Sequence, residues 1–378
     1  MSLKRLPTIL HQPVYWAIRS IVAVVGAGDL ASNIRIARDL GRRFGGARSN
    51  RQRLSRAVEH LGVAFPSWSV EERTEHALRA YEHLFALAME TVSSARLLTV
   101  DNWPSHVTLG DLAPTMRQLL GDQPSIMLTG HCGNWELLGY TMALLGFPLH
   151  ALYRPLDLKP ADDWVRRSRS AHGLILMDKF GAGEDLPAVF ERNGTPAFVA
   201  DQNAGDRALF VPYFGRLAST YKTIGLLAMQ YRAPVMCGVA LRQDQSSLAP
   251  SRRALAAGLS YHIEVIDIIL PEEWDAQPDP LFYITARYRR AIEKMVRMVP
   301  DQYLWMHRYW KSRPRHERLQ REFPGALKDK LLALPWMTPQ ELETIMEHSA
   351  RDTVSAATRA TKKGSSAMMQ ESPLVSQE

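Results

Sequence analysis

The chain has 378 residues, 46% of them hydrophobic and 22% charged, which is the composition of a folded globular protein with a sizeable core. Its net charge of +7 indicates an anionic partner, such as nucleic acid, an acidic membrane surface, a phosphorylated lipid or an acidic carrier protein. Two cysteines, Cys132 and Cys237, exclude a disulfide framework and a four-thiolate zinc site, and they favour a reducing compartment.

The N-terminal segment combines an apolar run with a cluster of arginines. Residues 13–28 are interrupted only by Arg19 and are too short to span a bilayer comfortably, so we predict an interfacial helix, with an uncleaved anchor as the alternative. Residues 34–56 carry eight arginines against one acid, Asp39. This pattern is typical of a helix that lies on anionic headgroups, and a solvated basic face is the alternative. No nucleic acid is expected, because no aromatic residues interleave with the arginines.

The next elements follow helical and then alternating periodicity. Residues 76–98 carry apolar side chains at helical spacing and predict a helix, and residues 111–120 predict a shorter one. Beyond them, short strands alternate with helices of 9–13 residues, which is typical of an α/β layer on a largely parallel sheet. The predicted strands are 125–129, 149–153, 174–177, 196–200, 234–241 and 261–268, and the intervening helices are 134–145, 160–172, 184–192 and 219–231.

The C-terminal third is predicted to be helical before it loses order. Residues 280–299 and 301–311 predict helices, and residues 326–334 and 338–348 predict peripheral ones. From residue 351 the Ser/Thr/Ala/Lys composition supports no core and predicts a disordered tail. We therefore expect an α/β fold in four parts: an N-terminal membrane-associating helical region that caps the sheet, an α/β core, peripheral helices and a tail. Their respective ranges are 1–110, 111–320, 321–350 and 351–378.

A histidine and an acid directly follow the first predicted strand of the core, in the sequence Gly-His-Cys-Gly-Asn-Trp-Glu. Open α/β sheets bind ligands at the carboxyl ends of their strands. On one continuous helix His131 and Glu136 would lie about 140° apart, so the two can meet only through a turn, which Gly133 permits. Asn134 is a good N-cap and places Glu136 in the first helical turn. We predict that Glu136 accepts a hydrogen bond from His131 and orients it as a general base.

Other chemistries fit this segment less well. The structural alternative is a core histidine beside an acid that complements the helix dipole. Cys132 is a poor nucleophile candidate, because neighbouring residues on an extended segment point to opposite faces. The chain has no His-Glu-x-x-His motif and no second histidine close by, so a zinc site has little support.

The segment from His131 to Glu136 resembles the His-x4-Asp/Glu signature of glycerolipid acyltransferases. More narrowly, it is similar to the bacterial lipid A biosynthesis (late lauroyl/myristoyl) acyltransferases. The match departs at Cys132, where the family usually carries a bulkier residue. The resemblance covers roughly residues 10–320. Further blocks match in order: Tyr153-Arg154-Pro155, Arg169 before His172-Gly173, Asp201-Gln202, residues 210–215, Thr220, Pro234-Val235, and residues 300–308 with Lys311, Arg313 and Pro314.

This resemblance implies an enzyme that is peripheral to, or singly anchored in, the inner membrane and faces the cytoplasm. Such an enzyme moves an acyl chain from acyl carrier protein, or acyl-CoA, onto a hydroxyl of a membrane lipid, and it requires no cofactor or metal. His131 would remove the proton of that hydroxyl while Glu136 holds the ring.

Six residues of the matching blocks are predicted to bind substrate: Arg154, Arg169, Asp201, Gln202, His307 and Arg308. The two arginines Arg154 and Arg169 suit a phosphate or a developing oxyanion, because a guanidinium offers a fixed bidentate fork; a surface ion pair is the alternative for Arg154. Asp201 and Gln202 would shape the acceptor pocket or brace the site. His307 and Arg308 would hold acidic groups near the mouth of the pocket.

The sequence leaves three alternatives open. The acceptor could be another phosphoglycolipid, an inositol mannoside or an aminolipid. Water could take the acceptor's place, which would make the protein a thioester hydrolase. The protein could also be a basic membrane-bound protein without catalytic activity.

Overall fold

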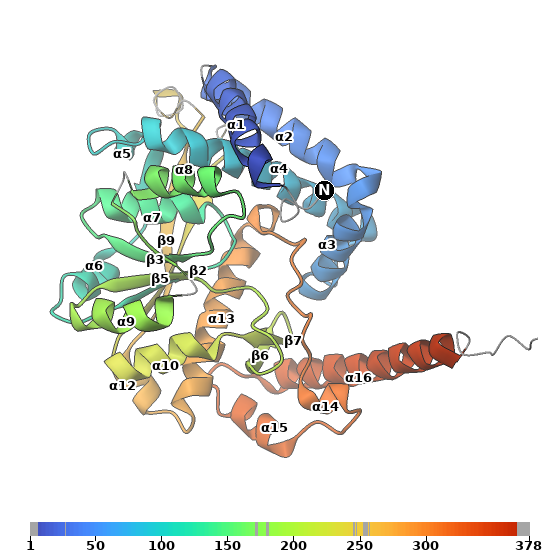
Figure 1. The fold of residues 1–378 in the computed structure, drawn as a ribbon. Helices are drawn as coiled ribbons and strands as arrows, with labels where there is room; N and C mark the ends of the chain where they lie inside the picture. The colour runs from blue at the N-terminus through green and yellow to red at the C-terminus, as the bar shows by residue number, and fades with distance from the viewer. Residues whose placement is uncertain are drawn as a thin grey trace, which may run out of the picture.

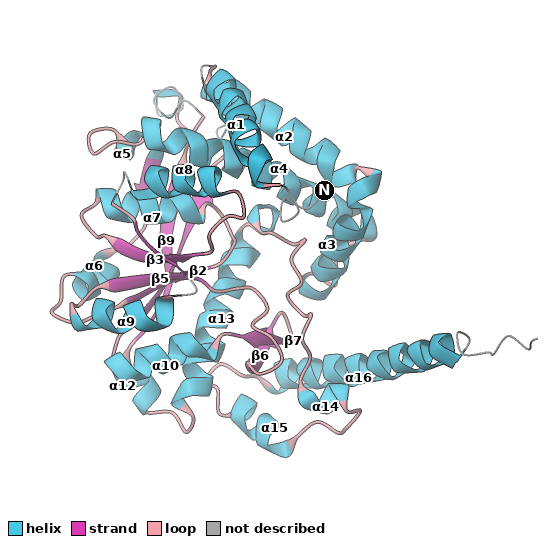
Figure 2. Ribbon diagram, in the orientation of Figure 1, coloured by secondary structure: helices cyan, strands magenta, loops and turns pink. Residues whose placement is uncertain are grey.

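The computed structural model describes residues 7–26, 28–170, 173–178, 181–244, 246, 248–251, 256 and 258–368. A seven-stranded sheet in the order β1-β9-β8-β2-β5-β3-β4 forms the centre of the molecule (Figure 2). Every neighbouring pair is parallel except β8 and β9. The predicted α/β fold with a largely parallel sheet is therefore confirmed. The strands are β1 (Val107–Leu109), β2 (Ile126–Thr129), β3 (Leu149–Tyr153), β4 (Ile175–Asp178), β5 (Thr195–Val199), β8 (Val235–Arg242) and β9 (Tyr261–Ile269).

Helices cover both faces of this sheet. Helices α7 and α8 lie over one face, whereas α9, α10 and α13 lie over the other (Figure 1). Strand β2 is buried along its whole length and apolar apart from its last residue, as expected for a parallel strand between two helical layers. The helices are α6 (Ala113–Leu119), α7 (Trp135–Leu144), α8 (Lys159–Ser170), α9 (Ala182–Glu191), α10 (Lys222–Tyr231), α12 (Pro271–Asp275) and α13 (Pro280–Met298).

The N-terminal region packs against this core. Helices α2 and α4 approach closely at Gly41. A Cβ atom at this position would lie only 2.5 Å from the carbonyl oxygen of Tyr81. Helix α4 is capped by a reciprocal pair of hydrogen bonds between Ser69 and Glu72. No helix in the described part of the chain has the length and apolar character needed to cross a bilayer. The helices of this region are α1 (His11–Gly26), α2 (Leu30–Gly46), α3 (Arg51–Ala64), α4 (Val70–Leu97) and α5 (Trp103–His106), with 3-10 turns η2 (Thr8–Leu10) and η3 (Arg48–Asn50).

One predicted helix starts later than expected, and another is largely replaced by other structure. Strands β6 (Leu209–Tyr213) and β7 (Arg216–Thr220) form a separate antiparallel hairpin, so the helix predicted from residue 219 begins at Lys222. The hairpin turns at Phe214 and Gly215, both with positive φ, a conformation that favours two-residue hairpin loops. Only η5 (Pro300–Gln302) forms within the helix predicted for residues 301–311.

The chain beyond η5 continues as an isolated bridge and turns, because its first residues bond to the histidine segment. The amide of Leu304 donates to the carbonyl of His131, and Tyr303 forms an antiparallel bridge with Cys132. A backbone with these partners has no helical ladder of its own. The segment 303–311 is thereby placed against the carboxyl end of β2.

The last described element is longer than predicted. Helices α14 (Arg315–Arg318), α15 (Gly325–Leu332) and α16 (Pro339–Met368) follow, and α16 projects from the body of the molecule (Figure 1). Helix α16 includes residues 351–368, for which the sequence predicted disorder. Alanine and lysine in this stretch favour a helix even without a core to bury. Residues 369–378 lie outside the described part of the chain.

Candidate active site

His131 and Asp201 occupy equivalent positions at the ends of two adjacent strands. Strands β2 and β5 run parallel with Thr129 opposite Val199, and each residue of the pair stands two positions further on. Atom Nδ1 of His131 lies 2.6 Å from Oδ1 of Asp201. The aspartate side chain is fully buried, and the imidazole is 19% exposed. An Nδ1–H that donates to Asp201 leaves the lone pair of Nε2 on the accessible edge of the ring.

The two charges stabilise each other. Burial alone would lower the pKa of His131, but the charge and hydrogen bond of Asp201, with the charge of Glu136, raise it above its ordinary value. Burial would likewise raise the pKa of Asp201, yet His131 and the charge of Arg289 hold it well below its usual range. Asp201 is therefore an anion at neutral pH, and it favours the protonated imidazole.

Glu136 has a different partner from the one predicted. Its carboxylate accepts two hydrogen bonds from the guanidinium of Arg169 on α8, one of them from Nε at 2.8 Å. The prediction that Glu136 bonds the imidazole is therefore wrong, and Asp201 takes that position. Glu136 does stand in the first turn of α7, whose N-cap Asn134 accepts from the amide of Leu137, as predicted. Because a guanidinium matches a carboxylate bidentately, Arg169 fixes the direction of Glu136.

Gln202 and His307 stand beside the accessible edge of the imidazole. The amide nitrogen Nε2 of Gln202 lies 3.4 Å from Nε2 of His131 and 3.5 Å from Nε2 of His307. The two imidazole rings are 5.4 Å apart, and the ring of Trp135 is 4.9 Å from that of His131. Burial and the nearby His131 lower the pKa of His307, so its neutral ring can accept from the amide, and Nε2 of His131 can accept when that ring is neutral.

The structure gathers four of the predicted residues in this cluster: His131, Asp201, Gln202 and His307. Glu136 and Arg169 form a pair at its edge. Arg154, after β3, and Arg308 are exposed, and neither joins these hydrogen bonds within the described part of the chain. His172, from one of the matching sequence blocks, lies outside the described residues.

A buried polar cluster that the sequence did not reveal holds the turn at Gly133. Glu90 of α4 forms an ion pair with Arg242 at the end of β8 and accepts a hydrogen bond from Tyr261. Asn134 donates to the same carboxylate. These side chains are buried, so each depends on its partners for hydrogen bonding.

This cluster reaches the backbone of the histidine segment through His83 and Gln302. His83 lies 3.4 Å from a guanidinium nitrogen of Arg242 and bonds the carbonyl of Gly133 through its other ring nitrogen. The amide of Gly133 donates to the carbonyl of Gln302 at 2.9 Å. Gly133 has φ +61°, and a Cβ atom there would lie 2.0 Å from a carbonyl oxygen, that of Ala240. Only glycine fits this turn.

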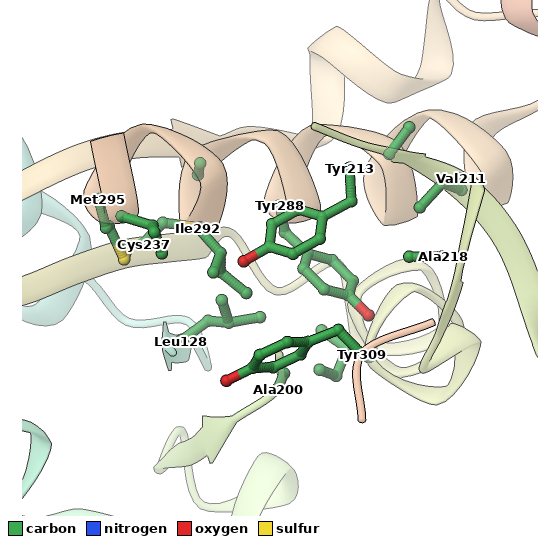
Figure 3. Close-up of a cluster of buried hydrophobic side chains, with 14 of the residues drawn as sticks. Leu128, Ala200, Val211, Tyr213, Ala218, Cys237, Tyr288, Ile292, Met295 and Tyr309 are labelled. Carbon is green, nitrogen blue, oxygen red and sulfur yellow. The ribbon is translucent and has the colours of Figure 1, made fainter. Parts of the chain in front are cut away.

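A third feature is a buried arginine behind Asp201. Arg289 of α13 is fully buried, and its Nη1 donates to the backbone carbonyl of Asp201 at 2.5 Å. Its guanidinium carbon lies 3.7 Å from the ring centre of Tyr213. Figure 3 shows Tyr213 and Tyr309 in the cluster of buried side chains that also includes Ala200, the residue before Asp201. The sequence of α13 indicated a helix and gave no sign of this role.

Thiol chemistry is disfavoured at this site. Burial, with the charge of Asp201, raises the pKa of Cys132, which disfavours a thiolate at this buried position. Among the residues that the structure describes, no three His, Cys, Asp or Glu side chains gather in a way that could hold a metal ion.

Comparison with known proteins places this geometry in context. Residues 4–312 match the family model described as bacterial lipid A biosynthesis acyltransferase. The chain is 25% identical over 328 residues to the lipid A biosynthesis lauroyltransferase of Escherichia coli, an alignment that covers 83% of this chain and 97% of that protein. It is also 25% identical over 276 residues to the lipid A biosynthesis palmitoleoyltransferase of the same organism, with 70% and 80% coverage. A lipid A biosynthesis acyltransferase of Shigella flexneri shows the same identity and coverage as the latter.

Proposed function

Since the chain belongs to the bacterial lipid A biosynthesis acyltransferase family and is an acyltransferase, we propose that it transfers a fatty acyl chain from acyl carrier protein, or acyl-CoA, to a hydroxyl of a lipid A-type acceptor. We propose His131 as the general base. The observation that carries the proposal is the 2.6 Å contact between Nδ1 of His131 and the buried carboxylate of Asp201. This contact directs the lone pair of Nε2 away from Asp201, toward the accessible side of the ring.

The proposed reaction needs one proton transfer in each direction. Nε2 of His131 removes the proton from the acceptor hydroxyl as its oxygen attacks the thioester carbonyl. The carbon–oxygen bond forms, and the carbonyl electrons move onto the oxygen. When that intermediate collapses, the carbon–sulfur bond breaks, and the imidazolium returns the proton to the leaving thiolate. Asp201 stabilises the imidazolium throughout, and a positioned base of this kind contributes about 10²–10⁴ in rate.

The neighbouring polar groups suit the charge that develops on the carbonyl oxygen. Gln202 lies 3.4 Å from Nε2 of His131, so its amide is close to the reacting atoms and can donate to the oxyanion. Glu136 stabilises the imidazolium through its negative charge, and Arg169 fixes the carboxylate of Glu136 in place. The exposed Arg154 and Arg308, with His307 at the inner edge, are proposed to hold phosphate groups of the donor or acceptor.

Helix α2 supports association with an anionic membrane surface. Its apolar side chains Ile36, Leu40 and Phe44 recur every four residues and are exposed. Arginines Arg35, Arg38 and Arg43 are exposed on the same helix. A helix with this pattern lies at a lipid interface, and each nearby cation contributes about 1 kcal/mol at an anionic surface. We propose that the enzyme works at the cytoplasmic face of the inner membrane, with this surface against the lipid.

An assay with the purified full-length protein tests the proposal. The protein is incubated with lauroyl-acyl carrier protein and a tetra-acylated, phosphorylated lipid A precursor in mixed micelles, and the lipids are analysed by mass spectrometry. The proposal expects an added acyl chain on the precursor, and none with His131→Ala. Free fatty acid without an acylated lipid would make the protein a hydrolase. A deletion strain that loses an acyl chain from a different glycolipid or aminolipid would instead identify that lipid as the acceptor.

A further inference from the structure

Arg289 carries a buried charge beside the histidine–aspartate pair. The residue is fully buried, and ionised groups in a protein interior are costly unless a countercharge and hydrogen bonds offset the lost hydration. One nitrogen donates to the carbonyl of Asp201, and the guanidinium stacks on Tyr213. The other two nitrogens have no hydrogen-bond partner among the described residues, and neither does Oδ2 of Asp201. The charge of Arg289 therefore adds to that of His131 in offsetting the burial of the Asp201 carboxylate.

From this arrangement we propose that Arg289 is a positioning residue for the acyl transfer. Its charge keeps the buried Asp201 carboxylate ionised, and its hydrogen bond fixes the backbone of Asp201 in register with His131. The imidazole then keeps its proton on Nδ1 and presents Nε2 as the base. This inference rests on the proposed function, in which His131 is that base.

The other titratable groups around the pair do not supply this positive charge. Burial raises the pKa values of the surrounding tyrosines and of Cys132, so these groups are neutral at neutral pH. The tyrosines are Tyr213, Tyr221, Tyr303 and Tyr309. His307 has a lowered pKa, and Glu136 is negative and paired with Arg169. Arg289 is thus the permanent cation that contacts Asp201 in the described structure.

Removing that cation has a defined direction. A positive charge opposes protonation of any nearby group, so its loss raises the pKa at which the His131–Asp201 pair takes up a proton. Arg289→Met removes the charge and keeps most of the side-chain volume. Arg289→Lys keeps the charge and loses the planar guanidinium with its several N–H donors. A purely structural arginine would weaken folding in both variants without moving this titration.

The experiment is a pH titration of His131 by NMR in full-length protein labelled with ¹⁵N-histidine, for wild type, Arg289→Met and Arg289→Lys. The control is Arg290→Met, which removes the next charge of α13, where the guanidinium lies over Trp336. We expect the pKa of the pair to rise by about one unit in Arg289→Met and to stay near the wild-type value in the other two. A folded Arg289→Met protein that titrates like wild type, or an equal rise in Arg290→Met, would overturn the proposal.

Because this readout needs no substrate, it separates the two hypotheses. A shifted titration in a protein that acylates no lipid would retain the role of Arg289 in tuning the pair and reject the proposed function. If Arg289→Met does not fold, the same question is answered in the Asp201→Asn background by urea unfolding. There Arg289 is an uncompensated buried charge, so adding Arg289→Met should restore stability. An Asp201→Asn protein that is further destabilised by Arg289→Met would count against the proposal.

Discussion

Nδ1 of His131 lies 2.6 Å from Oδ1 of Asp201, although 70 residues separate the two along the chain. The contact follows from strand register, because β2 and β5 are parallel neighbours and each residue stands two positions beyond paired strand ends. The pair is held from three sides: the Gly133 turn by α4, the Asp201 backbone by α13, and the His131 carbonyl by the segment after η5. Such support on rigid elements is what a precisely oriented base requires.

The pH dependence of acyl transfer should reflect the raised pKa of His131. The base works only when its Nε2 is unprotonated, so kcat/KM should fall as the pH drops through the pKa of the pair. Because Asp201 and Glu136 raise that pKa, this fall should begin above the ordinary histidine value of about 6.5. Initial rates measured from pH 5 to 9 would show it. A kcat/KM that falls only below the ordinary histidine pKa would contradict the assignment of His131, paired with Asp201, as the base.

Glu136→Gln should shift the pH at which kcat/KM falls without abolishing the reaction. The substitution removes a negative charge that favours the imidazolium, so the apparent pKa should fall toward its ordinary value. The Asp201 hydrogen bond remains, and we expect a loss of about tenfold or less at neutral pH, well below that for loss of the base. Arg169→Met is the matched variant, because it frees Glu136 and keeps its charge. An inactive Glu136→Gln enzyme would show that Glu136 has a direct role.

Sequence alone located the histidine but not its partner. The strand ending at Thr129, the N-cap Asn134 and the first-turn Glu136 were predicted correctly, because each depends on local pattern. Asp201 was predicted to shape the acceptor pocket or brace the site, and not to bond His131, since the sequence does not say which strands are neighbours. From the predicted strands 125–129 and 196–200, His131 is offset by two residues and Asp201 by one, so their equivalent positions emerge only from the strand register and order in the structure.

Other features depended on tertiary contacts in the same way. Aromatic and basic residues between 301 and 311 suggested a helix, whereas the backbone there bonds to residues 131–133. Glu90 and Arg289 lie on helices whose periodicity indicated burial and no chemistry. Their roles arise from Arg242 and Asp201, which other elements bring to them.

Glu90→Gln should destabilise the protein strongly. The ion pair with Arg242 is buried, and removing one partner leaves an uncompensated charge, at a cost of about 3–5 kcal/mol. Glu75→Gln on the same helix is the matched control. Its partner Arg42 is 42% exposed, so we expect a loss of about 1 kcal/mol or less. Urea unfolding of both variants measures the difference, and equal losses would contradict a special role for the buried pair.

Substituting the exposed apolar residues of α2 should release the protein from lipid. The double variant Ile36→Asp/Leu40→Asp places two anions in the proposed membrane surface and should abolish flotation with phosphatidylglycerol vesicles. Leu120→Asp changes an even more exposed leucine, directly after α6, and should float like wild type. Binding should also weaken as salt increases, since the screening length is about 10 Å at 0.1 M. Flotation of the double variant at wild-type levels would contradict this orientation.

The most direct test of the central claim is the kcat/KM of Asp201→Asn for acyl transfer at neutral pH. An amide has no charge to stabilise the imidazolium, and its NH2 group can face the ring in place of the oxygen that fixes Nδ1–H. The account predicts a loss of about 10²–10⁴, approaching that of His131→Ala, in a protein that remains folded. A folded Asp201→Asn enzyme with near wild-type kcat/KM, beside an inactive Glu136→Gln enzyme, would contradict it and return the orienting role to Glu136.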